Sequence, residues 1–237
     1  MPKKENIRQM FDDISGSYDH LNHLMSMNVD KCWRRRALRH IVAKDDGALD
    51  ILDLACGTGD FSVAIARRMK KFDNAGHVTG LDLSEGMLKV MDEKIAKAGL
   101  GDMVSTCLGD GEALPYADAF FDRVTIAFGI RNFEDRPKGL REMYRVLAPG
   151  GKLAILELSV PRNPFLRWLY KLYFLHILPA IGGAISGNKA AYKYLPASVL
   201  NFPSPGEFMQ TIREAGFTKV SAKSYTLGIC RLFLAEK

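Results

Sequence analysis

Short apolar runs alternate with amphipathic stretches along most of this chain, and that alternation restricts its fold more than any other feature. The expected strands are 48–55, 78–83, 104–108, 121–127, 152–158, 220–225 and 229–235. The expected helices among them are 61–69, 85–98, 137–146 and 204–215. Strands and helices in this order predict an α/β fold in which a mostly parallel sheet has helices on both faces.

The segment before the first strand has a different pattern. Residues 6–43 carry apolar side chains at spacings of three and four, which predicts helix, with a break at Ser15-Gly16. We expect a second helix over 30–42, with Asp30 as its N-cap. The basic run at 34–36 predicts a solvated helix face, and the glycine-rich run at 148–151 predicts a turn.

Length and composition limit the class of protein. The chain has 237 residues, 47% of them hydrophobic, which suits one domain with a sizeable core. We expect it to comprise a helical cap at 1–45, a ligand-binding core at 46–160, an insertion at 161–203 and a C-terminal helix with strands at 204–237. The sequence has no apolar run of about 18 residues, no secretory signal at its start and no CxxC pair, so we expect a cytoplasmic protein.

The first expected strand ends in the turn Asp53-Leu-Ala-Cys-Gly57-Thr58-Gly59-Asp60. Glycines there let the backbone approach a ligand, and the N-terminus of the following helix favours a negative group. A dinucleotide site needs a third glycine three residues after the second, and this chain has Ser62 at that position. A nucleoside with an amino-acid tail therefore fits the turn better than a pyrophosphate.

Carboxylates follow the next two strands. Asp82 ends the second strand, where it can accept hydrogen bonds from both hydroxyls of a ribose. Asp110 ends the third strand beside Gly111, where it can accept from the exocyclic amine of an adenine ring. Leu114 and Pro115 are expected to pack on that ring. Because the carboxyl ends of parallel strands meet at one edge, these groups predict a nucleoside pocket.

These motifs carry a family resemblance. The chain resembles the class I S-adenosylmethionine-dependent methyltransferases at LDLACGTGD, GLDLS, GDGEALP, FDRVTIAFGIRNF and RVLAPGGKL. It resembles the UbiE/MenG quinone-ring C-methyltransferases more narrowly, at FDDISGSYDHLNHLMSMNVDKCWR, AFGIRNF and ILPAIGGAISGNKAAYKYLPASVLNFP. The likeness covers essentially the whole chain and implies a Rossmann-like, seven-stranded sheet whose last strand is antiparallel.

The resemblance also implies the co-substrate, which is S-adenosyl-L-methionine, and no metal. The implied cofactor contacts are Asp53, Gly57, Thr58, Gly59, Asp82, Leu83, Asp110, Gly111 and Ala127. Some relatives carry serine where this chain has Ala127, so at most a backbone contact is expected there.

The reaction that the resemblance implies is C-methylation of the ring of demethylmenaquinol, giving menaquinol in the last step of menaquinone biosynthesis. A hydroquinone carbon is nucleophilic only when an adjacent hydroxyl is deprotonated, or hydrogen-bonded toward deprotonation. By resemblance, Tyr18 and Asn132 orient that hydroxyl, and Arg131 stabilises the phenolate or organises a water that removes the proton.

Several of these residues have a structural alternative. Arg131 and Asn132 could instead form a loop salt bridge and cap with Glu134 or Asp135. Glu157 could touch the acceptor pocket or cap the end of its strand.

The sequence alone leaves other functions open. A dual enzyme would also methylate 2-polyprenyl-6-methoxy-1,4-benzoquinol, and one sequence does not separate the two acceptors. A different small-molecule methyltransferase conflicts with the N-terminal signature, and an RNA methyltransferase would usually carry a dedicated basic module. A non-catalytic lipid-surface protein conflicts with the complete set of nucleoside-binding residues.

The positive charge is concentrated in one segment. The chain carries a net charge of +6, and no Asp or Glu lies between Glu157 and Glu207. The basic residues in that interval are Arg162, Arg167, Lys171, Lys189 and Lys193. Aromatic and apolar residues accompany them, which predicts peripheral contact with an anionic membrane at the inner face of the cell membrane, where a polyprenylated quinol would be met. We expect no nucleic-acid partner, and the residues leave a homodimer open.

Overall fold

The computed structural model describes residues 3–177 and 189–237. The strands are β1 (Asp50–Leu54), β2 (His77–Asp82), β3 (Val104–Leu108), β4 (Phe121–Ala127), β5 (Leu147–Leu158), β6 (Thr218–Tyr225) and β7 (Cys230–Glu236). The α-helices are α1 (Lys4–Ile14), α2 (Tyr18–Met25), α3 (Val29–Ile41), α4 (Asp60–Lys71), α5 (Glu85–Ala98), α6 (Arg136–Val146), α7 (Pro164–Leu172), α9 (Lys189–Leu200) and α10 (Pro205–Glu214). Short helical turns are η1 (Ile130–Asn132), η2 (Tyr173–Ile177) and η3 (Thr226–Gly228).

The strands form one seven-stranded sheet in the order β3-β2-β1-β4-β5-β7-β6. The first five strands pair in parallel, while β7 is antiparallel to both β5 and β6. This confirms the predicted mostly parallel sheet with an antiparallel last strand. The central strands are buried on both faces, as in Asp50–Leu54, where four of five residues are buried, because helices cover both sides.

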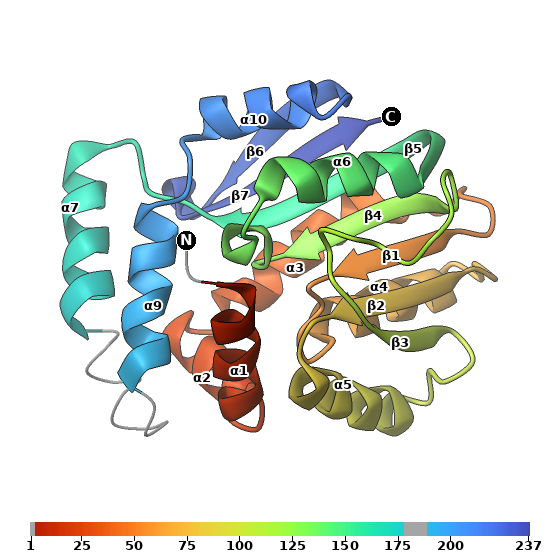
Figure 1. Cartoon of the computed structure of the whole chain (residues 1–237), viewed down its shortest axis with the longest axis horizontal. Helices are drawn as coiled ribbons and strands as arrows, with labels where there is room; N and C mark the ends of the chain where they lie inside the picture. Colours follow the sequence, from red (N-terminus) through yellow and green to blue (C-terminus); the bar gives the residue numbers. More distant parts are fainter. Residues whose placement is uncertain (1–2, 178–188) are drawn as a thin grey trace.

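Helices cover the two faces unequally, with α3, α4 and α5 on one face and α6 and α10 on the other (Figure 1). On the first face, Ile65 of α4 and Met91 of α5 pack against the strands, and both are fully buried. On the second face, Leu140 of α6 and Phe208 of α10 are fully buried. Such a three-layer arrangement leaves the strand ends as the place where loops can meet a ligand.

Three predictions about local structure were wrong in detail. The N-terminal segment forms three helices rather than two, because α2 fills the interval after the Ser15-Gly16 break. The N-cap of α3 is Asn28, in the left-handed region at φ 58°, and Asp30 lies buried inside the helix. The strand β5 begins at Leu147, so the predicted turn at 148–151 is an irregular part of that strand, with Gly150 at φ 76°.

Helices from both ends of the chain gather at the carboxyl edge of the parallel strands, to which the arrowheads of β1 and β4 point in Figure 1. They join in a small apolar cluster formed by Ile14 of α1, Met87 of α5, Tyr170 of α7, Phe174 of η2 and Val199 of α9. Within the described part of the chain, no helix has the length and apolar character needed to cross a membrane.

Candidate active site

A cavity of about 460 Å³ opens at the carboxyl edge of the sheet. The predicted site residues that line it are Tyr18, Asp53, Gly57, Thr58, Asp82, Leu83, Asp110, Gly111, Ala127, Arg131 and Asn132. Gly59 does not line it and instead begins α4 at φ 79°, where a Cβ would lie 2.4 Å from Cγ of Met91. Its role is therefore to permit the close packing of the turn on α5.

Asp82, at the end of β2, lines this cavity. Its two carboxylate oxygens accept hydrogen bonds from the backbone N–H groups of Gly57, at 2.8 Å, and Ser84, at 2.9 Å. Burial raises the pKa of this carboxyl group, and the two backbone donors oppose the rise. The carboxylate is thus fixed in orientation, with acceptor capacity left for hydroxyl groups of a ligand.

Asp53 is the most deeply buried acid of the cavity wall, with 1% of its surface exposed. It accepts hydrogen bonds from the hydroxyls of Ser62, at 2.6 Å, and Thr125, at 2.7 Å. Burial raises its pKa to about 6, against the effect of the two hydroxyl donors. Ser62, at the position of the missing third glycine, therefore holds a carboxylate in place, and that carboxylate is suited to a cationic group.

Asp110 is covered by the N-terminal helix. Nζ of Lys4 lies 2.6 Å from Oδ2 of Asp110 and 3.1 Å from Oε2 of Glu112. The predicted packing of Leu114 and Pro115 on a ligand ring is wrong, because Leu114 is buried in the core beneath α6 and Pro115 is exposed, and neither lines the cavity. Asp110 thus lines the cavity, whereas Leu114 and Pro115 do not.

Thr58 joins the glycine turn to two helices. Its hydroxyl donates to the carboxylate of Asp19 on α2, and Nζ of Lys94 on α5 lies 3.2 Å from the same hydroxyl oxygen. Lys94 also pairs with Asp19 at 2.5 Å and with Asp60 at 2.6 Å. These contacts close α2 over the turn.

Arg34 departs from the predicted solvated face, although the other two arginines of that run are exposed. It pairs with Asp30 and lies 3.6 Å from Asp60. The ring nitrogens of His23 lie 2.8 Å from Asp30 and 3.3 Å from Asp60. Potential metal-ligand atoms of His23, Asp30 and Asp60 lie within 4.8 Å of one another, but Arg34 already supplies a positive charge to both carboxylates.

Arg131 is buried in an ion pair. Its Nη1 lies 2.8 Å from Oε1 of Glu157, and its backbone N–H donates to the other oxygen at 3.2 Å. Burial is the largest single influence on the pKa of Arg131 and lowers it, but the charge and hydrogen bond of Glu157 together with the charges of Tyr18 and Tyr194 outweigh it, so the net shift is upward. The alternative pairing with Glu134 or Asp135 is wrong, because the carboxylate that pairs with Arg131 is that of Glu157.

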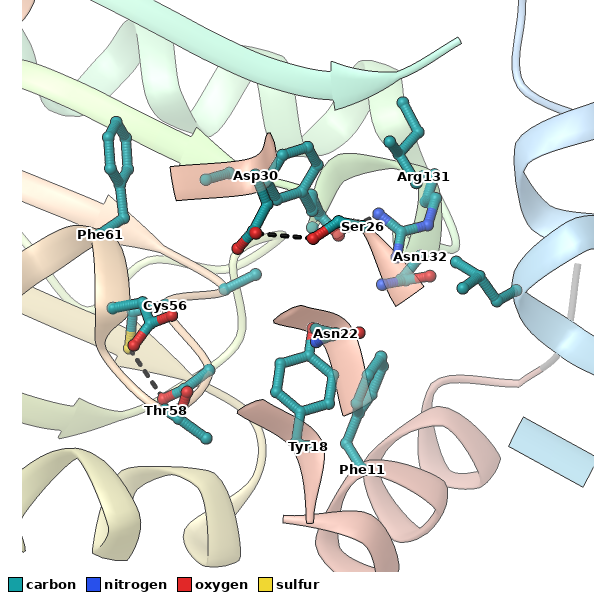
Figure 2. Close-up of a pocket in the computed structure, with 18 of the residues that line it drawn as sticks. Phe11, Tyr18, Asn22, Ser26, Asp30, Cys56, Thr58, Phe61, Arg131 and Asn132 are labelled. Atoms are coloured by element: carbon teal, nitrogen blue, oxygen red, sulfur yellow. Dashed lines mark hydrogen bonds between the residues drawn. The ribbon is translucent and has the colours of Figure 1, made fainter. Parts of the chain in front are cut away.

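Polar side chains from opposite sides converge on the middle of the cavity (Figure 2). Tyr18 and Asn22 of α2 face Arg131 and Asn132 of η1. Burial raises the pKa of Tyr18, so its hydroxyl stays protonated at neutral pH. Oδ1 of Asn132 accepts a hydrogen bond from the hydroxyl of Tyr194 at 3.0 Å, which fixes the amide.

An apolar part of the cavity wall belongs to the basic segment. Leu166, Leu169 and Tyr170 of α7 line the cavity. Phe165 and Trp168 do not line it and are 66% and 60% exposed. The side chains of Lys189 and Lys193, predicted as part of the basic surface, lie outside the described residues.

The residues at this site that were not predicted include Lys4, Asp19, Asn22, Lys94 and Tyr170. They come from helices outside the strand-end motifs, where a single sequence gives little positional information. The sequence offered one signal, because Asp19 directly follows the predicted site residue Tyr18.

The groups around the cavity fit a nucleoside with an amino-acid tail. Asp82 offers fixed acceptors for hydroxyls, Asp110 offers an acceptor for an amine, and Asp53 offers a buried anion for a cation. Gly57 has φ 55°, a backbone conformation that residues with a side chain rarely adopt, and its backbone is open to a ligand.

The fold and this cavity define a class of protein, the S-adenosylmethionine-dependent methyltransferases. The solved structure of such an enzyme from Aquifex aeolicus superposes with a TM-score of 0.61 at 20% identity, over 86% of this chain and 88% of that one. The sequence model of the ubiE/COQ5 methyltransferase family matches residues 1–237, and the chain belongs to that family.

Two named relatives illustrate the relationship. The chain is 43% identical to the ubiquinone/menaquinone biosynthesis C-methyltransferase UbiE of Geotalea daltonii, over 99% of this chain and 97% of the relative. It is 40% identical to the demethylmenaquinone methyltransferase of Bacteroides fragilis, over 99% of this chain and 94% of the relative.

Proposed function

We propose that this chain transfers a methyl group from S-adenosyl-L-methionine to a ring carbon of demethylmenaquinol, without a metal, and so forms menaquinol. One observation carries the proposal. A single cavity joins the carboxylates at the ends of β1, β2 and β3 to a buried arginine and to the apolar wall of α7. The first half suits the nucleoside and amino-acid groups of the cofactor, and the second suits an apolar ring that bears oxygen atoms.

The proposed cofactor contacts divide by chemistry. Asp82 would hold the ribose hydroxyls, Asp110 the adenine amine and Asp53 the ammonium group of the tail. Gly57, Thr58, Leu83, Gly111 and the backbone at Ala127 would complete the contact surface, whereas Gly59 would act through the turn. The bound cofactor supplies an electrophilic methyl group on its sulfonium, and this chain supplies position and charge.

The acceptor needs help to lose its hydroxyl proton. Tyr18 is protonated and Arg131 is charged at neutral pH, so neither serves as the base. Both would donate to the acceptor oxygen and stabilise its phenolate form, with Asn132 orienting the hydroxyl. A water molecule at the mouth of the cavity would carry the proton away.

A dual enzyme is the second candidate function. It is favoured by the relative named for both ubiquinone and menaquinone biosynthesis, which is as similar to this chain as the relative named for menaquinone alone. Both acceptors would use the same polar groups and the same apolar wall.

The exposed face of α7 supports contact with an anionic membrane at the inner face of the cell membrane. Its exposed aromatic residues, Phe165 and Trp168, stack at 6.3 Å, and Arg167 and Lys171 are exposed on the same helix. Met27 and Leu227, which line the cavity, are 79% and 74% exposed. Apolar side chains at the rim of the cavity, with cations beside them, suit a lipid surface from which a prenylated quinol enters.

The test is a rate comparison. Purified protein with labelled S-adenosyl-L-methionine receives reduced short-chain demethylmenaquinol in one reaction and 2-polyprenyl-6-methoxy-1,4-benzoquinol in another. Transfer to the naphthoquinol alone supports the first function, and transfer to both supports the dual enzyme. Transfer to neither quinol, with cofactor binding intact, would refute the acceptor assignment.

A further inference from the structure

Two buried donors, on residues that line the cavity, have no hydrogen-bond partner among the described residues. They are the hydroxyl of Tyr170 and Nε of Arg131. Each residue is 6% exposed, and both line the same cavity. Folded proteins rarely leave such atoms unsatisfied, because desolvation without a hydrogen bond is costly. A ligand that brings an acceptor atom would compensate this cost.

Both donors are held rigidly, and from different elements. The ring of Tyr170 stacks on Phe174 at 4.3 Å and packs in the cluster with Met87 and Val199. The guanidinium of Arg131 is fixed by Glu157 and by the carbonyl oxygen of Phe128. Neither side chain holds the other in place. A contact between them therefore does not explain why both line the same cavity.

The electrostatic setting of Tyr170 makes it a donor. Burial raises the pKa of its hydroxyl, and the positive charge of Arg131 is near enough to oppose that rise. The hydroxyl is therefore protonated at neutral pH. Since Nε of a guanidinium can only donate, these two atoms together suit an oxygen atom with high electron density.

We propose that Tyr170 is a further catalytic residue, whose hydroxyl and Nε of Arg131 together bind one ring oxygen of the quinol and favour its phenolate form. This rests on the proposed function. The phenolate oxygen pushes its electron pair into the ring, and the ring carbon takes the methyl group as the methyl–sulfur bond breaks. That bond's electron pair stays on sulfur. The ring carbon then loses its hydrogen to water as a proton, and the aromatic ring returns.

The experiment compares Tyr170→Phe with the wild-type enzyme across pH. Removing the hydroxyl should lower kcat/KM for reduced demethylmenaquinol about tenfold at pH 7, the effect of one hydrogen bond to a charged group. The acid limb of the pH profile should move about one unit upward, because the bound quinol ionises less readily. The dissociation constant for S-adenosyl-L-methionine should not change.

The stability of the variant separates this role from a structural one. A tyrosine hydroxyl bonded within the protein would lower the urea midpoint on removal, whereas the hydroxyl of Tyr170 has no such bond among the described residues to lose. We therefore expect a urea midpoint that is not lowered, and that rises in the protein without ligand because the buried hydroxyl no longer carries its desolvation cost. Tyr225→Phe is the matched control, since Tyr225 is 8% exposed and lies outside the cavity, and its kinetics should match those of the wild type.

Two failures are distinguishable. A wild-type enzyme that methylates no quinol would overturn the proposed function. An active wild-type enzyme whose Tyr170→Phe variant keeps the same kcat/KM and the same pH profile would overturn the role of Tyr170 alone.

Discussion

The guanidinium of Arg131 and the carboxylate of Glu157 form a buried ion pair, with the two side chains 6% and 0% exposed and 2.8 Å between Nη1 and Oε1. Glu157 does not line the cavity, so it acts on the site through Arg131. The Glu157→Gln substitution removes the negative charge and leaves a buried cation without its partner. We expect a loss of about 3 kcal/mol in the free energy of unfolding, measured in urea.

A double variant is the control for that prediction. Replacing Arg131 by methionine and Glu157 by leucine in one protein removes both charges. The free energy of unfolding should then fall by less than the sum of the losses in the single variants Arg131→Met and Glu157→Leu. Equal costs for the double variant and that sum would mean that the two side chains are not coupled.

Asp82 is the residue on which cofactor affinity should depend most. Asp82→Asn keeps the size of the side chain but replaces one acceptor oxygen by a donor, which disturbs the bonds from Gly57 and Ser84 and from ribose hydroxyls. Calorimetry should show affinity for S-adenosyl-L-methionine roughly ten- to a hundredfold lower. Asp92→Asn, an exposed change on α5, is the matched control and should bind normally. Wild-type affinity in the Asp82 variant would remove this residue from the site.

Asp53 should make folding stability depend on pH. Its pKa is about 6 in the folded protein and 3.8 in its reference state, so the folded chain holds the proton more tightly. Stability from this group is therefore fully present below pH 3.8 and is lost as pH rises through 6, by about 3 kcal/mol in total. The difference in unfolding free energy between the wild type and Asp53→Asn should follow this curve between pH 4 and 7. A constant difference over that range would contradict the raised pKa.

The membrane contact predicts a fluorescence change from a single residue. The chain has two tryptophans, of which Trp33 is 5% exposed and Trp168 is 60% exposed. Anionic vesicles at low salt should shift the emission to shorter wavelength, and Trp168→Phe should abolish the shift. Replacing Arg167 and Lys171 by glutamine should weaken binding.

Two controls address specificity. Replacing Lys70 and Lys71 at the end of α4 by glutamine makes the same change in net charge away from the cavity, and should leave vesicle binding intact. If both pairs of substitutions weaken binding equally, the attraction is general and α7 is not the contact. A shift that depends on protein concentration without vesicles would instead indicate a second copy of this chain on α7.

The parallel sheet and the strand-end carboxylates could be predicted because their determinants are local. The strand Asp50–Leu54 is mostly apolar and is followed by a glycine turn, and an acid marks the end of each of the next two strands. Asp82 and Asp110 follow directly from that pattern, and both line the cavity. Parallel pairing then brings them to one edge without further information.

The cover of the site could not be predicted in the same way. Lys4 meets Asp110 across 106 positions of sequence, and Arg131 meets Glu157 across 26. Such contacts depend on how helices pack after the sheet has formed, and residue type alone does not choose among several acidic neighbours. Arg34 illustrates this, because a run of three arginines predicts exposure while the helix face turns one of them inward.

The position of the transferred methyl group tests the central claim most directly. Wild-type protein is incubated with S-adenosyl-L-methionine carrying a trideuterated methyl group and with reduced short-chain demethylmenaquinol, and the product is then oxidised and examined by mass spectrometry and NMR. Ring C-methylation predicts a quinone that retains the label on a ring carbon. Label found in a methyl ether, which does not oxidise back to a quinone, would contradict the account.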